Sequence, residues 1–178
     1  MLVGCIGVLM TATAFVSDVP PLVQDRLTAT NETHGTFVQT KRLPTGEEFV
    51  SSGRWRIRPG IDFEWRISDP FDALFWADQA KYIYSNEDEF VEKPLDELTG
   101  FEHFKDARTG DFSAFFKAFD ALYKEDSDGF HVLAKPKDAR LTRFLTRVEA
   151  DGVPTNWTFR ATFPDRTTFD VKIDEHPR

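Results

Sequence analysis

Alternation of large apolar and polar residues with a period of two is the feature that most constrains this chain. In residues 62–68, Phe63, Trp65 and Ile67 alternate with charged or polar side chains, and residues 157–163 repeat the pattern near the other end. Successive side chains of a β-strand point to opposite faces, so this pattern predicts strands with one apolar and one polar face. Its recurrence along the chain predicts an antiparallel sheet of about nine or ten strands.

Turn sequences rich in Pro, Gly and Asp separate the expected strands. Strands are predicted over residues 36–41, 54–58, 63–67, 74–76, 82–84, 89–91, 130–134, 140–149, 157–163 and 168–173. A helix is expected to start at Pro21, a single helical turn at 94–98, and a further helix after Asp111, whose side chain suits an N-cap. That last helix carries apolar residues at the i, i+3, i+4 and i+7 spacing.

A twisted sheet of this size tends to curl or close, and a strongly aromatic face has to be covered from water. The predicted fold class is therefore α+β, mainly antiparallel β, with an incomplete, half-open β-barrel covered by a helical lid. The Phe-rich segment 112–119 is the expected lid. We predict no internal repeat and no linker.

The first 16 residues form an apolar leader that is too short to cross a bilayer, which takes about 20 apolar residues. An Ala-Thr-Ala sequence at 12–14 suits signal-peptide cleavage, so residues 17–178 are expected to form one domain. The first basic residue is Arg26, so the leader lacks a basic n-region, and a hydrophobic first element of the domain stays open. Cys5 follows Leu-Val-Gly as in a lipobox, which leaves lipidation as a further alternative.

Charge and composition argue against several function classes. The chain has 22 Lys and Arg against 30 Asp and Glu, a net charge of −8, which disfavours binding to nucleic acid through basic residues. Its single Cys can form neither an internal disulfide nor a thiolate-rich metal site. The four histidines are scattered at His34, His103, His131 and His176. No nucleophile motif or phosphate-binding loop is present, so we expect no enzyme activity, catalytic residue, metal or cofactor.

Six short motifs follow one another in a specific order between residues 37 and 84. They are Phe37-x-Gln39-x-Lys41, Ser52-Gly53-Arg54-Trp55-x-x-Arg58-Pro59, Trp65, Pro70-Phe71-Asp72, Leu74-Phe75-Trp76-x-Asp78 and Lys81-x-x-Tyr84. In this order the chain resembles the periplasmic carriers of outer-membrane lipoproteins, the LolA-like family. The resemblance implies an apolar cavity that shields acyl chains, and it assigns Arg58 the role of a latch that helps hold the lid closed.

The resemblance also implies a location and partners. It places the chain in the periplasm of a Gram-negative bacterium, carrying an acylated lipoprotein from an inner-membrane donor complex to an outer-membrane acceptor. We expect a monomer. The missing basic n-region and the Phe-rich middle segment depart from the family pattern and leave open a variant that serves another lipid.

The lipid-binding residues are predicted from the strand alternation and from the apolar stripe of the lid helix. They are Trp55, Ile57, Phe63, Trp65, Ile67, Leu74, Trp76, Tyr82, Tyr84, Phe112, Phe115, Phe116, Phe119, Trp157, Phe159 and Phe163. Rings are stiff and bulky, so a concave sheet lined by them is hard to fill completely, and an unfilled apolar concavity suits an acyl chain. For any single ring, the alternative is an ordinary packed core.

Three other functions remain open at this stage. A regulatory or interaction module of the same fold would sense a lipid or a protein partner. A lipid-modifying enzyme would need an inward hydroxyl, for which Tyr82 and Tyr84 are the candidates. A membrane-anchored acceptor of the same fold would begin at Cys5 after processing, whereas a free carrier would begin at Phe15.

Overall fold

The structure is a computed structural model of the 178-residue chain. It describes residues 32–58, 62–78, 80–98, 118–127, 129–153 and 155–176. The leader predicted at 1–16, the helix predicted from Pro21 and residues 112–117 of the predicted lid lie outside the described residues.

The described residues contain eleven strands, which form one antiparallel sheet. The strands are β1 (Thr33–Arg42), β2 (Glu48–Arg58), β3 (Asp62–Asp69), β4 (Ala73–Ala77), β5 (Lys81–Asn86), β6 (Phe90–Pro94), β7 (Phe119–Asp126), β8 (Gly129–Pro136), β9 (Arg147–Val153), β10 (Asn156–Thr162) and β11 (Thr168–Glu175). Their order across the sheet is β6-β5-β4-β3-β2-β1-β11-β10-β9-β8-β7.

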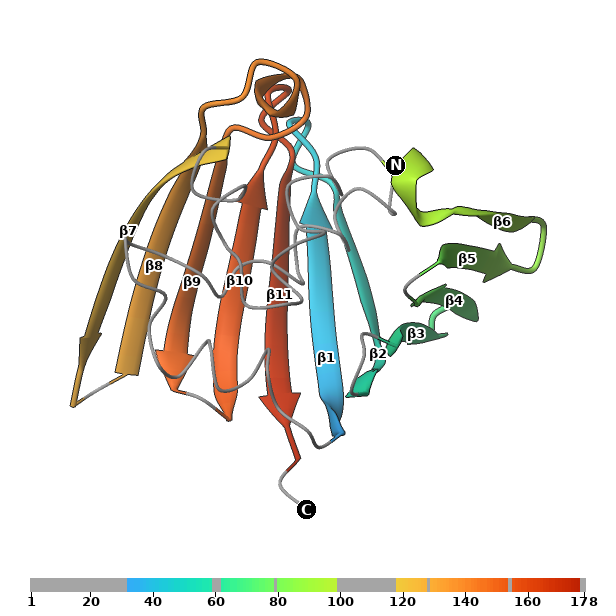
Figure 1. Ribbon diagram of the computed structural model, residues 1–178. Coiled ribbons are helices and arrows are strands. Elements are labelled where there is room, and N and C mark those ends of the chain that lie inside the picture. The colour runs from blue at the N-terminus through green and yellow to red at the C-terminus, as the bar shows by residue number, and fades with distance from the viewer. Residues whose placement is uncertain are drawn as a thin grey trace.

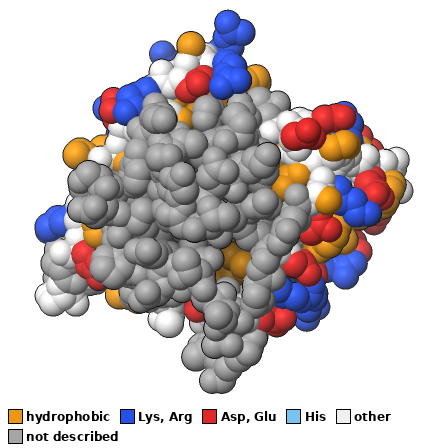
Figure 2. Space-filling model, viewed as in Figure 1, with side chains coloured by type: hydrophobic (Ala, Val, Ile, Leu, Met, Phe, Trp, Pro, Cys, Tyr) orange, Lys and Arg blue, Asp and Glu red, His pale blue; other side chains and the backbone are white. Residues whose placement is uncertain are grey.

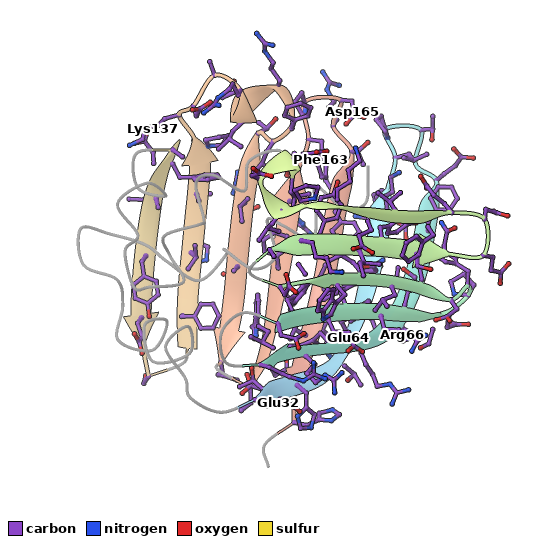
Figure 3. The ribbon with its side chains drawn as sticks, turned by 45° about the vertical axis from the view of Figure 1, so that its right-hand side comes forward. Glu32, Glu64, Arg66, Lys137, Phe163 and Asp165 are labelled. Carbon is purple, nitrogen blue, oxygen red and sulfur yellow. The ribbon has the colours of Figure 1, made fainter. Side chains whose placement is uncertain are left out.

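The first and last strands, β1 and β11, pair with each other in the middle of the sheet. The sheet grows outward from them in both directions and ends at β6 and β7, which are consecutive strands in the chain but opposite edges of the sheet. Figure 1 shows β7–β11 and β1 running side by side, whereas β4–β6 lie to the right of β2 and run in a different direction. In Figure 3 the β3–β6 half crosses in front of the other half, so the sheet is strongly bent and unclosed.

The antiparallel, unclosed sheet confirms the mainly β part of the predicted fold. The helices whose bounds fall within the described ranges are two 3-10 turns, η1 (Leu95–Glu97) and η4 (Leu141–Arg143). The first of these confirms the helical turn predicted at 94–98. A helical lid is not shown. No helix within the described part of the chain is long and apolar enough to span a membrane.

Two predicted turns form the hairpins on either side of the central strands. Between β1 and β2, Gly46 takes φ +92° and its N–H donates to the Leu43 carbonyl at 2.9 Å. Between β10 and β11, Arg166 has φ +68°, and the Asp165 carboxylate accepts a hydrogen bond from the Thr167 N–H at 2.9 Å. Short turn sequences therefore set the register of these pairs.

The helix predicted after Asp111 does not extend to the end of the segment 112–119, because Phe119 begins strand β7. Phe119 and its neighbours pair with β8 through a tight hairpin. Ala121 and Tyr123 pack against the core, whereas Leu122 is exposed, which is period-two behaviour. Strand pairing with β8 has overridden the helical spacing of the apolar residues.

The strand predicted at 140–149 is shorter and later than expected. Its first residues form η4, and β9 begins only at Arg147. β9 also continues through Asp151 and Gly152, which follow the end of the predicted strand at 149, and Val153 still pairs with Asn156 of β10. The positive φ of Gly152, +140°, therefore falls inside a strand and not in a turn.

Candidate functional site

The inner face of the bent sheet is lined by apolar side chains from ten adjacent strands, β5 to β7 in the order of the sheet. Its buried members on the strands are Phe37, Trp55, Phe63, Trp65, Ile67, Ala73, Phe75, Ala77, Tyr82, Phe119, Val132, Ala134, Val148, Ala150, Trp157, Phe159, Ala161, Phe169, Val171 and Ile173. Antiparallel pairing places directly opposed residues on one face, as Trp55 opposite Trp65 and Trp65 opposite Phe75. These side chains belong to a single core cluster.

Most of the predicted site residues inside the described ranges lie on this face. Those that are buried in the core cluster are Trp55, Phe63, Trp65, Ile67, Tyr82, Phe119, Trp157 and Phe159. Ile57 and Phe163 are half-buried and pack against the cluster. Tyr84 is half-buried and shares the face through its register with Phe75. Whether these side chains contact lipid stays a prediction, and Phe112, Phe115 and Phe116 lie outside the described residues.

Leu74 and Trp76 were predicted on the inner face, and that assignment is wrong. In β4 the buried positions alternate as Ala73, Phe75 and Ala77, so Leu74 and Trp76 lie on the outer face. The Trp76 indole N–H donates to the Asp62 carboxylate at 2.6 Å there. The strand sequence is apolar at every position, so alternation alone cannot orient it.

A series of ring contacts joins the strands of the β1–β5 half. Phe37 stacks on Trp65 with ring centres 3.7 Å apart and planes 19° apart. Phe63 and Phe75 are 6.2 Å apart, and Phe75 and Tyr82 are 6.0 Å apart. Phe37 and Phe75 are absent from the predicted site residues, although the even spacing of Phe37 and Gln39 in the first strand was a usable signal.

Small side chains line the opposite half of the inner face. Ala134, Ala150 and Ala161 lie on β8, β9 and β10, which run side by side in Figure 1, and all three are buried. Val132 and Val148 lie on the same face. The strand alternation over 157–163 placed Ala161 on this face, but none of these residues is among the predicted lipid-binding residues, because alanine and valine give a weaker alternation signal than rings. The β7–β11 half of the inner face therefore carries short aliphatic side chains between its rings, such as Trp157 and Phe159.

Three tryptophans on the inner face bury an indole N–H without an acceptor among the described residues. Trp55, Trp65 and Trp157 are 7%, 2% and 7% exposed, and each Nε1 is shielded and unpaired. A buried unpaired donor lowers the stability of the fold by about 1–3 kcal/mol, so three such donors on one face are unusual. Gly35 makes room for one of them, because an added Cβ there would lie 2.8 Å from the Trp55 Nε1 and 1.9 Å from the Asp174 carbonyl oxygen.

Other polar side chains on this face mostly pair with one another. Gln39 and Ser51 are both buried, and the Gln39 amide nitrogen donates to the Ser51 hydroxyl at 2.7 Å, which leaves the amide oxygen unpaired. On edge strand β7, the Tyr123 hydroxyl donates to Glu125. Burial first, and then this hydrogen bond, raise the pKa of Tyr123 above its ordinary value of 10.0. The phenol therefore stays neutral at physiological pH.

Arg58, the predicted latch, lies at the end of β2 beside carboxylates. Its guanidinium donates to Asp62, and its Nε lies 3.4 Å from a carboxylate oxygen of Glu32. The hydrogen bond to Asp62 is the main reason that the pKa of Arg58 is raised further above its ordinary value. Asp62 thus joins Arg58 to the Trp76 indole. The lid residues expected to meet Arg58 lie outside the described residues, so the latch stays a prediction.

The outer face carries paired charges of both signs. Across β2 and β3, Arg56 donates to Glu64, and Arg66 lies 3.2 Å from the Asp72 carboxylate after the turn that ends β3. Figure 3 labels Glu64 and Arg66 on β3, and Figure 2 shows basic and acidic side chains next to each other around the visible face. Exposed pairs of this kind contribute little to stability. Their position on the outer side of the strands marks that side as the solvated face of the sheet.

The described part of the chain contains no group of three or more His, Cys, Asp or Glu side chains placed to hold a metal ion.

Comparison with known proteins bears on the family. No family model matches the sequence. The "Outer-membrane lipoprotein carrier protein" of Sodalis glossinidius (strain morsitans) is 27% identical over 186 residues, which cover 99% of this chain and 87% of that protein. The resemblance to the outer-membrane lipoprotein carriers is confirmed. This carrier-like chain is thus similar to its relative over nearly its whole length, which supports a carrier-type fold.

Solved structures give weaker likenesses to this carrier-like chain. A LolA superfamily protein from Nitrosomonas europaea has a TM-score of 0.45 at 7% identity, covering 87% of this chain and 90% of that one. A DUF1329 family protein from Desulfovibrio piger has a TM-score of 0.42 at 12% identity, covering 98% and 90%. Neither TM-score is high enough to carry an argument about this chain.

Proposed function

We propose that this chain is a periplasmic carrier that binds the acyl chains of lipoproteins, or of another acylated lipid, on the inner face of its sheet. The observation that carries the proposal is the continuous apolar inner face of an unclosed sheet, in a chain similar to an outer-membrane lipoprotein carrier protein. The carrier exchanges cargo with an inner-membrane donor complex and an outer-membrane acceptor, acts as a monomer and catalyses no reaction.

The energetics of acyl transfer call for such a face. Each buried methylene is worth about 0.8 kcal/mol relative to water, so a 16-carbon chain gains on the order of 12 kcal/mol by leaving water. A lipid therefore does not cross an aqueous space unaided. Transfer from a membrane to an apolar protein face exchanges one apolar environment for another, so the net free energy is small and the cargo can be released again.

The unclosed sheet supports a mechanism of entry. The edge strands β6 and β7 do not pair with each other in the strand order, so the barrel is open between them. We propose that the part of the predicted lid that precedes β7, residues 112–117, covers this opening when the carrier is empty and moves aside when acyl chains enter. Arg58 favours the closed state in this proposal, by exchanging its carboxylate partners for lid carbonyl groups.

A pair of adjacent residues on β5 tests the proposed face. Tyr84 and Ile83 are both half-buried, but Tyr84 faces inward and Ile83 outward. Binding of an environment-sensitive acyl probe is measured by fluorescence in wild type, Tyr84→Asp and Ile83→Asp, after circular dichroism has shown that each variant is folded. We expect Tyr84→Asp to weaken binding about tenfold or more, because burying a charge beside the chain is costly, and Ile83→Asp to leave it unchanged.

Two results would contradict the proposal. A folded wild-type protein that binds no acyl probe rules out the carrier function. Equal binding by the inward and outward variants rules out the inner face as the site.

A further inference from the structure

We infer that the inward tryptophans recognise the carbonyl oxygen of the ester or amide that links an acyl chain to the rest of the cargo. This inference rests on the proposed function and deepens it. It assigns the indole N–H groups of Trp55, Trp65 and Trp157 the role of hydrogen-bond donors on a mainly apolar face. The carrier then selects acyl-linked lipids over hydrocarbon chains attached in other ways.

The three indoles share an unusual combination of features. They come from β2, β3 and β10, their side chains are more than nine-tenths buried on the same face, and none has an acceptor within the described ranges. Buried indole N–H groups usually find a partner. The outward Trp76 follows that rule, since it donates to Asp62 at 2.6 Å. The unpaired donors are therefore a property of the inner face and not of tryptophan in this chain.

The chemistry of indole restricts what can complete these sites. An indole N–H is a donor and never an acceptor, so its partner must supply a lone pair. The surrounding side chains are apolar, and a charged phosphate or carboxylate would lose its hydration on entering. A neutral carbonyl meets both conditions at lower cost. Every ester- or amide-linked acyl chain carries one at its polar end.

The backbone around Trp55 holds its donor in place. The indole lies over Gly35 of β1, where a Cβ would come within 2.8 Å of Nε1. Trp157 lies on the opposite half of the face, with its ring 6.4 Å from that of Phe130. Trp65 is stacked on Phe37 and is the most deeply buried of the three. Donors on both halves of the face suit a cargo that carries more than one acyl group.

Two lysophosphatidylcholines with the same 16-carbon chain test the inference, one ester-linked and one ether-linked. The headgroups are identical, and only the ester has the carbonyl. Affinities are measured by calorimetry below the critical micelle concentration for wild type, Trp55→Phe, Trp157→Phe and the outward control Trp76→Phe. We expect wild type to prefer the ester by about 2- to 10-fold, which is the usual contribution of one hydrogen bond. The preference should shrink in at least one inward variant and persist in Trp76→Phe.

A second measurement needs no substitution. The chain has four tryptophans, so a ¹⁵N-labelled sample gives up to four indole N–H resonances. The ester lipid should shift inward indole resonances downfield relative to the ether lipid and leave the Trp76 resonance in place. Equal affinity of wild type for the two lipids, with no difference between the indole spectra, would overturn the inference while leaving the carrier function intact. Binding of neither lipid would overturn both.

Discussion

Phe37 is the residue whose truncation should reveal most clearly how the inner face is packed. It lies on the central strand β1, is 1% exposed and stacks on Trp65 with ring centres 3.7 Å apart. Replacing a buried Phe by Ala costs about 3–5 kcal/mol, and loss of a ring pair adds about 0.5–1.5 kcal/mol. We expect Phe37→Ala to lower the free energy of unfolding by about 4–5 kcal/mol, the upper end of this range. Phe37→Leu keeps most of the volume and should cost about 1–1.5 kcal/mol.

Equilibrium unfolding in urea measures these costs. With a denaturant slope of about 2 kcal/mol per molar, Phe37→Ala should lower the midpoint by about 2 M. Phe49 on the neighbouring strand β2 is the matched control because it is 56% exposed, and Phe49→Ala should change the free energy of unfolding by less than about 0.5 kcal/mol. Equal midpoints for the two alanine variants would refute the assignment of Phe37 to a packed face.

Backbone geometry and one turn carboxylate give the remaining predictions. Gly53→Ala places a Cβ 1.8 Å from the Arg66 carbonyl oxygen and should sharply lower the melting temperature, whereas Gly46→Ala, with open space around it but φ +92°, should cost only about 1 kcal/mol. The pKa of Asp78 is lowered chiefly by hydrogen bonds from the backbone amides two and three residues later. Its carboxylate therefore stabilises the fold above the unfolded pKa of about 4, and this contribution is lost as the pH falls through the lower folded pKa. The stability difference between wild type and Asp78→Asn should shrink between about pH 5 and about pH 2 in urea titrations, and a difference independent of pH would contradict the assignment.

Alternation predicted the inner-face residues correctly in strands where apolar and charged residues alternate. Phe63 and Trp65 are flanked by charged residues, and both are buried as expected. The same rule failed at Leu74 and Trp76, where every residue of the strand is apolar and only the register with β3 decides which side faces inward. Period-two alternation can orient a strand only where one face carries polar side chains and the other apolar ones.

The error at β7 has a different cause. Spacing of apolar residues at i, i+3, i+4 and i+7 is compatible with a helix, but Phe119 also begins a strand whose partner β8 follows directly in the chain. Tertiary pairing outweighs local spacing in such ambiguous segments. The strand predicted at 140–149 begins only at Arg147, because Leu141–Arg143 form a 3-10 turn whose two ends are held by local hydrogen bonds.

Non-local features lay beyond sequence reasoning. The pairing of β1 with β11 joins segments more than a hundred residues apart and has no local signature. The unpaired state of the inward indoles depends on which acceptors surround each ring in space, and the sequence shows only that tryptophan is present. The sequence also does not show why residue 35 is glycine. The reason is spatial, because a Cβ there would clash with the Asp174 backbone and the Trp55 ring.

Photo-crosslinking tests the central claim, that the inner face of the sheet holds acyl chains, most directly. A palmitoylated lipid with a diazirine on its acyl chain is bound, irradiated and located by peptide mass spectrometry. The account predicts adducts on inward side chains such as Tyr84 and Phe130. Adducts confined to outward residues such as Ile83 and Trp76, or no adduct on the sheet at all, would contradict it.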